Sequence, residues 1–294
     1  MKRRWVLCAV VALSLLAVAC GSDDGGKDTA STGDKDGVTT STFAAGSVPD
    51  AIQKRGKLIA GVKFDQRLFG LKNPTSGDVE GLDVEIAKLV AKRLLGDEKK
   101  IEFVETVSKN REAFIQEGKV DIVVATYTIN DTRKQVVDFA GPYYVARQDI
   151  LVKKSDTQVK SVQDLNGKKV CTAQGSTSLT NLQAQAPQAD ISTLFDKYSL
   201  CVEALNDGRV DAVTTDNGIL AGFVDESPDK YKLVNAPFST EPLGIGLKKG
   251  EQAFRTFLND LLDASFKNGD WKKAIDKTVG KVIPGTTPPT LDRY

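Results

Sequence analysis

The chain has 294 residues, a formal net charge of +1 and 40% hydrophobic residues. This length allows one large domain or two smaller ones with substantial cores, and the balanced charge gives no indication of nucleic-acid binding. The sequence contains no histidine, which excludes Ser–His–Asp and Cys–His catalytic sites and most zinc sites. We expect neither a cofactor nor a metal ion.

The first twenty residues have the pattern of a bacterial export signal. Three basic residues precede an apolar run that is too short for a comfortable membrane span. The run ends in AVAC, which resembles the lipobox of bacterial lipoproteins, although Ala17 stands where leucine is more usual. We predict a signal peptide over residues 1–19 and a lipid on Cys20, and a plain secretory signal is the alternative.

The segment that follows the signal is predicted to be a flexible tether. Residues 20–47 consist mainly of Gly, Ser, Thr and Asp and contain almost nothing apolar, so they have too little surface to bury for folding. Such a composition after a lipid anchor holds a folded domain away from the membrane. We therefore expect the folded part to work at the extracellular face of the bacterial cell membrane.

Two cysteines remain once Cys8 has left with the signal and Cys20 carries the lipid. Cys171 and Cys201 would lie in an oxidising compartment, where we expect them to form a disulfide. Two separate buried thiols are the alternative. The chain has no CxxC sequence, so redox catalysis is not indicated.

From residue 50 onward, short apolar runs alternate with helical patterns. Buried strands are predicted at 57–63, 101–106 and 120–126, and a helix with one apolar face at 82–95. This alternation predicts an α/β fold whose sheets are covered on both faces. The apolar spacing over 251–280 predicts a helix that packs on the first part of the fold.

One sequence pattern occurs twice. EAFIQEGKVDIVVAT (112–126) and EALNDGRVDAVTTD (203–216) share a helix, a Gly stop, a basic residue, Val-Asp and a buried strand. Two similar α/β lobes leave a crevice at the carboxyl ends of their strands, where open sheets bind ligands. Thr126 and Asp216 occupy matching positions at these strand ends, so we expect both at the crevice.

Residues 50–280 resemble the extracellular solute-binding proteins of family 3, the polar amino-acid branch that serves ABC importers. The resemblance is carried by EGLDVEIAKLVAKRL, GKVDIVVATYTINDTRKQVVDFAGPYY and GRVDAVTTD. KFDQRLFGL and PYYVARQDILV are similar to the glutamate-binding lipoproteins of actinobacteria. The resemblance implies the two-lobed periplasmic-binding type II fold, in which a mixed sheet flanked by helices forms each lobe and the ligand lies between them.

The lobes implied by the resemblance are discontinuous in sequence. Lobe 1 is expected over 48–146 and 242–294, and lobe 2 over 147–241. The chain would cross between them near residues 144–147 and again near 240–243.

A free amino acid presents a carboxylate and an ammonium group on one carbon, and the resemblance implies a partner for each. Arg133 matches the Arg that binds the carboxylate, because a guanidinium grips a carboxylate bidentately, and Thr126 and Thr128 would complete the hydrogen bonds. Asp216 matches the Asp that binds the ammonium. The alternatives are a solvated arginine at a helix start for Arg133 and a helix N-cap for Asp216.

The sequence GSTS at 175–178 lies between a predicted strand and a helical stretch. The backbone N–H groups of Ser176 and Thr177 at this helix start would form an anion site for the same carboxylate. A simple helix cap is the alternative.

Two further cations near strand ends of lobe 1 suggest a second carboxylate on the ligand. They are Lys63 and Arg111, the latter in an S-x-x-R element that begins at Ser108 and is similar to that of glutamate and aspartate binders. The alternative is that both are solvated or pair with Asp65 and Glu112. Further candidates for ligand contact or for an aromatic wall are Gln66, Arg67, Arg147, Phe64 and Phe69.

We therefore predict a monomeric protein that captures glutamate or aspartate by lobe closure and delivers it to the permease and ATPase subunits of an ABC importer. A glutamine or asparagine binder and a sensory amino-acid-binding module are the alternatives. An enzyme similar to the cyclohexadienyl dehydratases would need a general acid over its substrate. The matched positions offer no suitable unpaired glutamate, so we expect no enzyme.

Overall fold

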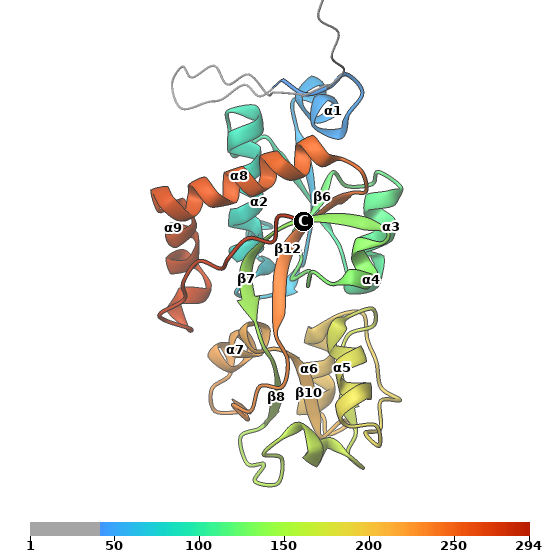
Figure 1. The fold of residues 1–294 in the computed structure, drawn as a ribbon. Helices are drawn as coiled ribbons and strands as arrows, with labels where there is room; N and C mark the ends of the chain where they lie inside the picture. The colour runs from blue at the N-terminus through green and yellow to red at the C-terminus, as the bar shows by residue number, and fades with distance from the viewer. Residues whose placement is uncertain (1–41) are drawn as a thin grey trace, which may run out of the picture. The chain divides into compact units, whose positions relative to one another are not determined.

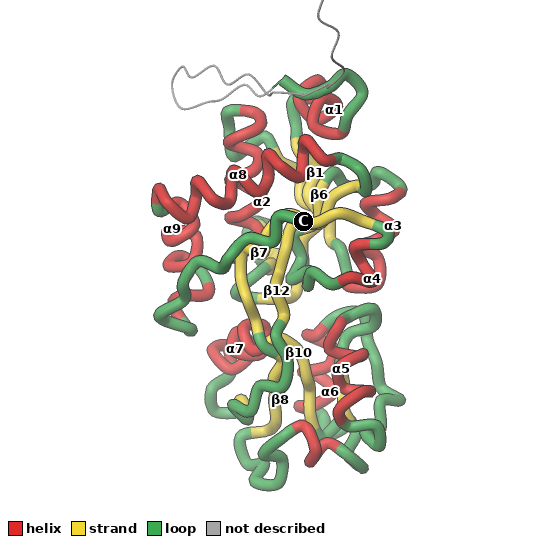
Figure 2. The backbone as a smooth tube through the Cα atoms, in the orientation of Figure 1, coloured by secondary structure: helices red, strands yellow, loops and turns green. Residues whose placement is uncertain are grey.

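The computed structural model describes residues 42–294 (Figures 1 and 2). The predicted signal peptide, the lipid on Cys20 and most of the tether lie outside the described residues. Within the described range, no helix has the length and apolar character that a membrane span requires.

A five-stranded sheet forms the centre of the first lobe. Its strands are ordered β5 (Ile101–Glu105), β1 (Leu58–Val62), β6 (Ile122–Val123), β12 (Glu241–Lys248) and β7 (Val137–Ala146). β1 pairs in parallel with β5 and β6, whereas β12 pairs antiparallel with β6 and β7. The three parallel strands lie where the apolar runs predicted them, and β6 is shorter than its run.

Helices cover this sheet. α2 (Leu82–Leu95) illustrates why the sequence folds in this way: Ile86, Val90 and Leu94 recur every fourth residue and are all buried, and the helix ends at Gly96 with a positive φ of 77°. The other helices of lobe 1 are α1 (Val48–Arg55), η1 (Ser108–Asn110), α3 (Arg111–Gln116), α4 (Asp131–Lys134), α8 (Gln252–Asn268), α9 (Asp270–Lys277) and η3 (Val279–Lys281).

The helix predicted over 251–280 is interrupted. α8 ends at Asn268, and α9 begins at Asp270 after Gly269, which adopts a φ of 86° that favours glycine. The apolar face of α8 and Trp271 of α9 are buried in the core of lobe 1, as expected.

A four-stranded sheet forms the centre of the second lobe. Its strands are ordered β11 (Tyr231–Leu233), β8 (Gln148–Lys153), β10 (Ala212–Asp216) and β9 (Val170–Cys171). The helices of lobe 2 are η2 (Val162–Leu165), α5 (Thr177–Gln185), α6 (Tyr198–Asn206) and α7 (Asn217–Glu226). A small sheet of β2 (Asp65–Gln66), β3 (Gly70–Lys72) and β4 (Val79–Glu80) belongs to lobe 1.

The repeated sequence pattern folds alike in both lobes. α3 precedes β6 in lobe 1, and α6 precedes β10 in lobe 2; each strand pairs in parallel with another strand of its own sheet. The expected α/β class is thereby confirmed. The lobe boundaries given by residue number stay predictions, and "lobe 1" and "lobe 2" below denote the elements around the two large sheets.

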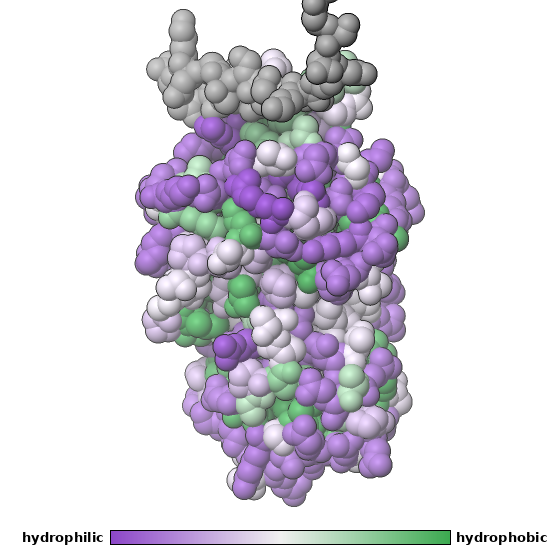
Figure 3. Space-filling view, in the orientation of Figure 1, coloured by the Kyte–Doolittle hydropathy of each residue, from purple (hydrophilic) through white to green (hydrophobic). Residues whose placement is uncertain are grey.

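β7 and β12 are the crossover strands. They pair along most of their length, with Glu241 opposite Ala146, and in Figure 1 they run side by side toward β8 and β10. The face drawn in Figure 3 is dominated by hydrophilic residues, with hydrophobic ones in small separate groups. Because β7 and β12 run from one large sheet toward the other, this pair of strands connects the two lobes.

Candidate functional site

A small polar cavity lies between the two lobes. About 220 Å³ of space not filled by protein atoms lies here, a volume that includes open solvent at the mouth. Its lining residues are Ser108, Arg111, Thr126, Thr128, Ser176, Thr177, Ser178, Tyr198, Thr215, Asp216 and Ile219. Seven of these were candidates from sequence, namely Ser108, Arg111, Thr126, Thr128, Ser176, Thr177 and Asp216.

A buried carboxylate fixes the turn after β6. The backbone N–H of Thr126 donates to Asp83 Oδ2 at 2.9 Å, and the Tyr143 hydroxyl donates to Asp83 Oδ1 at 2.6 Å. Thr126 adopts a φ of 44°, which is unusual for a β-branched residue and marks a strained position. Burial raises the pKa of Asp83 to about 7. Asp83, which the sequence analysis missed, holds Thr126 at the cavity.

Arg133 is buried, so it is not the solvated helix-opening arginine of the alternative. α4 positions it, since Asn130 Oδ1 accepts a hydrogen bond from the Arg133 backbone N–H at 2.9 Å. Its guanidinium donates to the Thr128 carbonyl oxygen at 2.7 Å and pairs with Glu112 at 3.3 Å. A further bond, at 3.2 Å, reaches the Gly175 carbonyl oxygen in lobe 2. Arg133 is not among the cavity-lining residues of the described chain, but it bonds to Thr128 in the cavity wall and to Gly175 of lobe 2.

Arg111 is even more deeply buried, and its guanidinium lies over the Tyr127 ring, 4.3 Å from the ring centroid. It donates to the carbonyl oxygens of Ser108, Ala125, Thr126 and Gly175 at 3.1–3.2 Å. No carboxylate of residues 42–294 lies within ion-pair distance of it. Its positive charge is therefore not neutralised by a direct partner in the described part of the chain.

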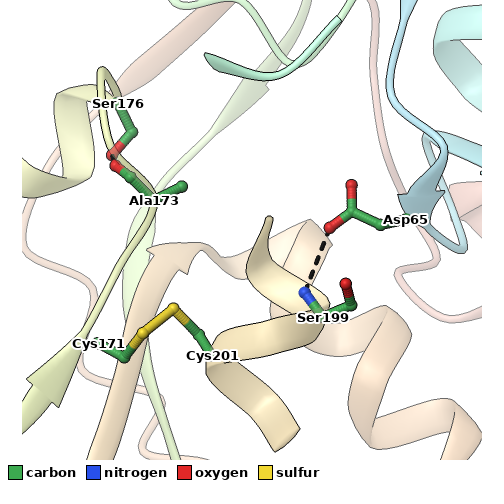
Figure 4. Close-up of a disulfide and its surroundings, with 6 residues drawn as sticks. All are labelled: Asp65, Cys171, Ala173, Ser176, Ser199 and Cys201. Atoms are coloured by element: carbon green, nitrogen blue, oxygen red, sulfur yellow. Dashed lines mark hydrogen bonds between the residues drawn. A yellow bond between two sulfur atoms is a disulfide. The ribbon is translucent and has the colours of Figure 1, made fainter. Parts of the chain in front are cut away.

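Lys63 lies directly behind the cavity wall. It is 3% exposed, and its Nζ donates to Ser108 Oγ at 2.9 Å. Burial and the nearby Arg111 lower the pKa of Lys63 to about 7. Asp65, the acid considered as its partner, instead accepts a hydrogen bond from the Ser199 backbone N–H at 3.2 Å (Figure 4).

Gln66 is close to the same wall. Its Oε1 accepts a hydrogen bond from Thr126 Oγ1 at 3.1 Å. Its buried Nε2 has no hydrogen-bond partner among the described residues. A buried amide N–H₂ without a partner is costly unless something else accepts its hydrogen bonds.

The lobe 2 wall combines a helix cap with an open helix N-terminus. Ser176 Oγ accepts from the Leu179 backbone N–H at 3.2 Å and donates to the Ala173 carbonyl oxygen at 2.7 Å. Thr177 begins α5, and its hydroxyl donates to Glu241 Oε2 at 2.8 Å. The helix cap, which was the alternative to an anion site, is therefore present. The Ser176 backbone N–H also donates to the Ala173 carbonyl oxygen, at 3.3 Å, and Ser176, Thr177 and Ser178 line the cavity.

Asp216 ends β10 and is buried at the cavity. Its side chain makes no capping hydrogen bond to α7, so the helix-cap alternative is not what the structure contains. Burial and the nearby carboxylate of Glu241 raise the pKa of Asp216 to about 8. A cation placed in the cavity would favour the ionised form of this group.

Two further arginine candidates lie away from the cavity. Arg67 pairs with Asp225 of lobe 2 at 3.1 Å, with 47% of its side chain exposed, and Arg147 is exposed at the end of β7. Sequence position placed both near strand ends, but the direction of a side chain there depends on the turn that follows. Neither is among the cavity-lining residues of the described chain.

The aromatic lining also differs from the expectation. Phe69 packs against Tyr144 in the core with ring centroids 5.5 Å apart, and the Phe64 ring lies 5.3 Å from the Lys72 ammonium. Neither lines the cavity within the described residues, whereas Tyr198 at the start of α6 does. The sequence offered no local signal for Tyr198, since its position depends on how α6 packs across lobe 2.

Cys171 and Cys201 form a disulfide that joins β9 to α6 (Figure 4). β9 leads into the segment that carries Ser176, and α6 carries Ser199, which bonds to Asp65 of lobe 1. The disulfide therefore holds together two of the parts of lobe 2 that touch lobe 1.

The fold and the cavity define a class: two-lobed α/β proteins of the periplasmic-binding type II fold, with a polar site between the lobes. The family model described as bacterial extracellular solute-binding proteins, family 3, matches residues 58–281. The chain belongs to this family. The predictions of the family and of the fold are confirmed, and the expected class of binding protein rather than enzyme agrees with them.

Relatives of known name cover nearly the whole chain. The chain is 42% identical to the ABC transporter glutamine-binding protein GlnH of Bacillus subtilis over 93% of this chain and 95% of the relative. It is 35% identical to the glutamate-binding protein GluB of Corynebacterium glutamicum over 87% and 91%. A crystal structure of the solute receptor for L-cysteine of Neisseria gonorrhoeae has a TM-score of 0.76 and 30% identity, covering 81% of this chain and 95% of that one.

Proposed function

We propose that the cavity binds a free amino acid and that both lobes are required to hold it. The guanidinium of Arg133 and the N–H groups of Ser176 and Thr177 would bind the α-carboxylate, and Asp216 would bind the α-ammonium. The support is that Asp216, a buried anion of lobe 2, lines the cavity, and that Arg133, a buried cation of lobe 1, bonds to Thr128 in the cavity wall. A ligand that engages both would stabilise the closed lobes, so closure would report occupancy.

We infer that the side chain of the ligand is acidic, as in glutamate or aspartate. The observation that carries this inference is the burial of Arg111 and Lys63, neither of which has a carboxylate within ion-pair distance in residues 42–294. An uncompensated buried charge is costly, and a second carboxylate would neutralise it. Charge counting then gives three cations for two carboxylates, and Asp216 for the ammonium.

Glutamine is the second candidate, and specific observations favour it. The Bacillus subtilis relative is named for glutamine, and the unpartnered Gln66 Nε2 is a neutral donor that suits an amide carbonyl. Burial also lowers the pKa of Lys63 to about 7, so that the neutral amine form of Lys63, which suits an uncharged amide, is populated near neutral pH. The choice between acid and amide thus depends on whether Lys63 is charged when the ligand is bound.

We further propose that the protein is a monomer held by a lipid on Cys20 at the outer face of the cell membrane. There it would deliver its amino acid to the permease and ATPase of an ABC importer. The family, described as extracellular solute-binding proteins, supports this location. A sensory role would use the same cavity and differ only in the protein that recognises the closed lobes.

The test is calorimetric titration of the chain produced without residues 1–20 against glutamate, aspartate, glutamine and asparagine. Lys63→Met removes the charge and keeps an apolar stem, whereas Arg111→Ala would also strand several carbonyl groups. We expect Lys63→Met to weaken glutamate binding at least about tenfold and glutamine binding much less. Lys72→Met, at an exposed position of the same lobe, is the matched control.

The outcomes separate the proposals. Tight binding of the acids by the parent, lost in Lys63→Met, supports an acidic ligand. A parent that prefers the amides overturns the acidic ligand but keeps the amino-acid site. No binding of any of the four ligands overturns the amino-acid site itself.

A further inference from the structure

Glu241 is a buried acid at the start of the crossover strand β12. Its Oε2 accepts a hydrogen bond from Thr177 Oγ1 at 2.8 Å. Its Oε1 accepts two more, from Asn181 Nδ2 at 2.8 Å and from Ser239 Oγ at 2.7 Å. Because Thr177 and Asn181 both belong to α5, Glu241 fixes the N-terminal turns of that helix against the crossover strand.

The same strand fixes the opposite wall of the cavity. The Ile129 backbone N–H donates to the Pro242 carbonyl oxygen at 2.8 Å, and Thr128 lies opposite Leu243 in an antiparallel bridge. Thr128 of lobe 1 and Thr177 of lobe 2 are thus anchored within three residues of one strand. Their hydroxyl oxygens lie 3.3 Å apart.

The direction of the hydroxyl hydrogens follows from Glu241. The Glu241 carboxyl group accepts three hydrogen bonds on its two oxygens, one of them from Thr177. The Thr177 hydrogen is therefore committed to Glu241. In the contact between the two hydroxyls, Thr128 must then be the donor, and only acceptor lone pairs of Thr128 Oγ1 remain for the cavity.

We propose that Glu241 is a positioning residue that makes Thr128 Oγ1 an acceptor for the α-ammonium group of the ligand, in addition to Asp216. The proposal rests on the proposed amino-acid site. Glu241 does not line the cavity, so it would act through Thr177 and Thr128 rather than by touching the ligand. An ammonium group has three hydrogens to donate, and one carboxylate alone does not satisfy all three.

Glu241→Gln is the single substitution that tests this positioning role most directly. The amide oxygen is expected in the place of Oε1, where two donors converge, so the amide N–H₂ takes the place of Oε2 and faces Thr177. Thr177 then accepts from Gln and donates to Thr128, and the Thr128 hydrogen is turned toward the cavity. A donor in that position repels an ammonium and accommodates a ligand that lacks one.

The experiment measures one ratio in the chain produced without residues 1–20. It is the affinity for the amino acid that binds most tightly, divided by the affinity for the same molecule without its amino group. Glutarate is the analogue for glutamate and glutaramate for glutamine, and competition against the bound amino acid measures weak analogues. We expect Glu241→Gln to lower the ratio about tenfold, because a hydrogen bond to a charged group is lost.

Thr128→Val should lower the ratio by a similar factor. The double variant Glu241→Gln/Thr128→Val should lower it no further, because both changes act on one hydrogen bond. Asp149→Asn is the control for loss of a buried acid in lobe 2, since Asp149 is 3% exposed and does not line the cavity. It is expected to change thermal stability and leave the ratio unchanged.

An equal loss of affinity for both ligands in Glu241→Gln, or additive effects in the double variant, would overturn the role of Glu241. The amino-acid site would survive that result. If the parent binds no amino acid, the proposed function itself is wrong. The two failures are therefore distinguishable. Should Glu241→Gln not fold, Thr177→Val tests the same chain of hydroxyl groups and must lower the ratio.

Discussion

Gly175 of lobe 2 lies directly against the backbone of Lys109 of lobe 1. A β-carbon built on Gly175 would be 2.6 Å from the Lys109 Cα, closer than real contacts allow. The Gly175 carbonyl oxygen also accepts hydrogen bonds from both Arg111 and Arg133. The absence of a side chain at this position therefore permits the lobes to approach until both arginines are reached.

We predict that Gly175→Ala prevents full closure. The clashing atoms belong to the backbone and cannot rotate away, so we expect ligand affinity to fall at least about tenfold, mainly through faster dissociation. Stopped-flow and calorimetric titration measure the two effects.

Gly208→Ala is the matched control for that change. Gly208 has a φ of 74°, close to the 73° of Gly175, and its β-carbon would meet only the Lys153 Nζ at 3.7 Å. Alanine at either glycine carries a similar backbone strain, of about 1–2 kcal/mol, in open and closed lobes. Equal loss of affinity in both variants would show that strain rather than closure is responsible.

Two reciprocal ion pairs at the rim of the cavity predict a salt-dependent affinity. Lys109 of lobe 1 pairs with Asp196 of lobe 2 at 2.8 Å, and Glu105 of lobe 1 pairs with Lys197 of lobe 2. Their side chains are 35–43% exposed, so each pair contributes at most about 1 kcal/mol, and salt screens it. We expect ligand affinity to fall about two- to fivefold between low salt and about 0.5 M salt.

The double variant Lys109→Gln/Lys197→Gln should lose part of this salt dependence, because the Arg67–Asp225 pair between the lobes remains. Lys267→Gln is the control, because Lys267 makes an exposed pair with Asp263 inside one helix of lobe 1. If the affinity of the parent and that of the double variant fall equally with salt, the salt dependence comes from ligand binding itself. The two ion pairs at the rim then do not contribute to lobe closure.

Asp216 predicts opposite effects on stability and on binding. Burial raises the pKa of Asp216 from its ordinary 3.8 to about 8, so the folded protein holds a proton there that the unfolded chain releases. The stability from this proton is complete at low pH and is lost as the pH rises through about 8. Asparagine does not ionise, so Asp216→Asn does not lose stability in this way as the pH rises. We expect the variant without ligand to melt about 2–4 °C above the parent near pH 8.

The same Asp216→Asn variant should bind its amino acid at least about a hundredfold more weakly, because the ammonium loses its anion. Thermal unfolding from pH 5 to 9 without ligand, together with titration at pH 7, checks both effects. A variant that is less stable than the parent at every pH would mean that Asp216 is structurally required rather than held at a cost for its ligand.

The residues that sequence predicted at the cavity share one property: each follows a strand end or opens a helix in a continuous motif. Thr126 and Thr128 lie three and five residues after the end of β6, and Asp216 was found because the β6 pattern recurs in β10. These positions depend on local chain geometry, so the motif places them without knowledge of the sheet order. The same is true of Ser176 and Thr177 at the start of α5.

Residues whose position depends on packing between distant parts of the chain were not predicted at the site. Glu241 reaches Thr177 only because β12 inserts between β6 and β7, an order that no local pattern encodes. Asp83 on α2 accepts a hydrogen bond from Thr126, 43 residues further along the chain, and Tyr198 at the start of α6 lines the cavity. Arg67 lies outside the cavity lining of the described chain, because the side of the sheet to which a side chain near a strand end points is not fixed by the local sequence, and here Arg67 pairs with Asp225.

The disulfide between Cys171 and Cys201 offers a last test, because it connects stability with closure. It closes a loop with a sequence separation of 30, for which chain entropy predicts about 3–4 kcal/mol of stabilisation. The double variant Cys171→Ser/Cys201→Ser should therefore have a lower free energy of unfolding, measured by urea denaturation.

The disulfide also connects β9, which leads to Gly175, with α6, whose Ser199 N–H donates to Asp65 of lobe 1. We expect the folded variant to bind ligand more weakly as well, about two- to tenfold, because two parts of lobe 2 must be ordered separately on closure. Cys201→Ser alone also breaks the cross-link but keeps the Cys171 sulfur, so its difference from the double variant measures the effect of that sulfur atom. A variant that is destabilised but binds with unchanged affinity would confine the disulfide to the stability of lobe 2.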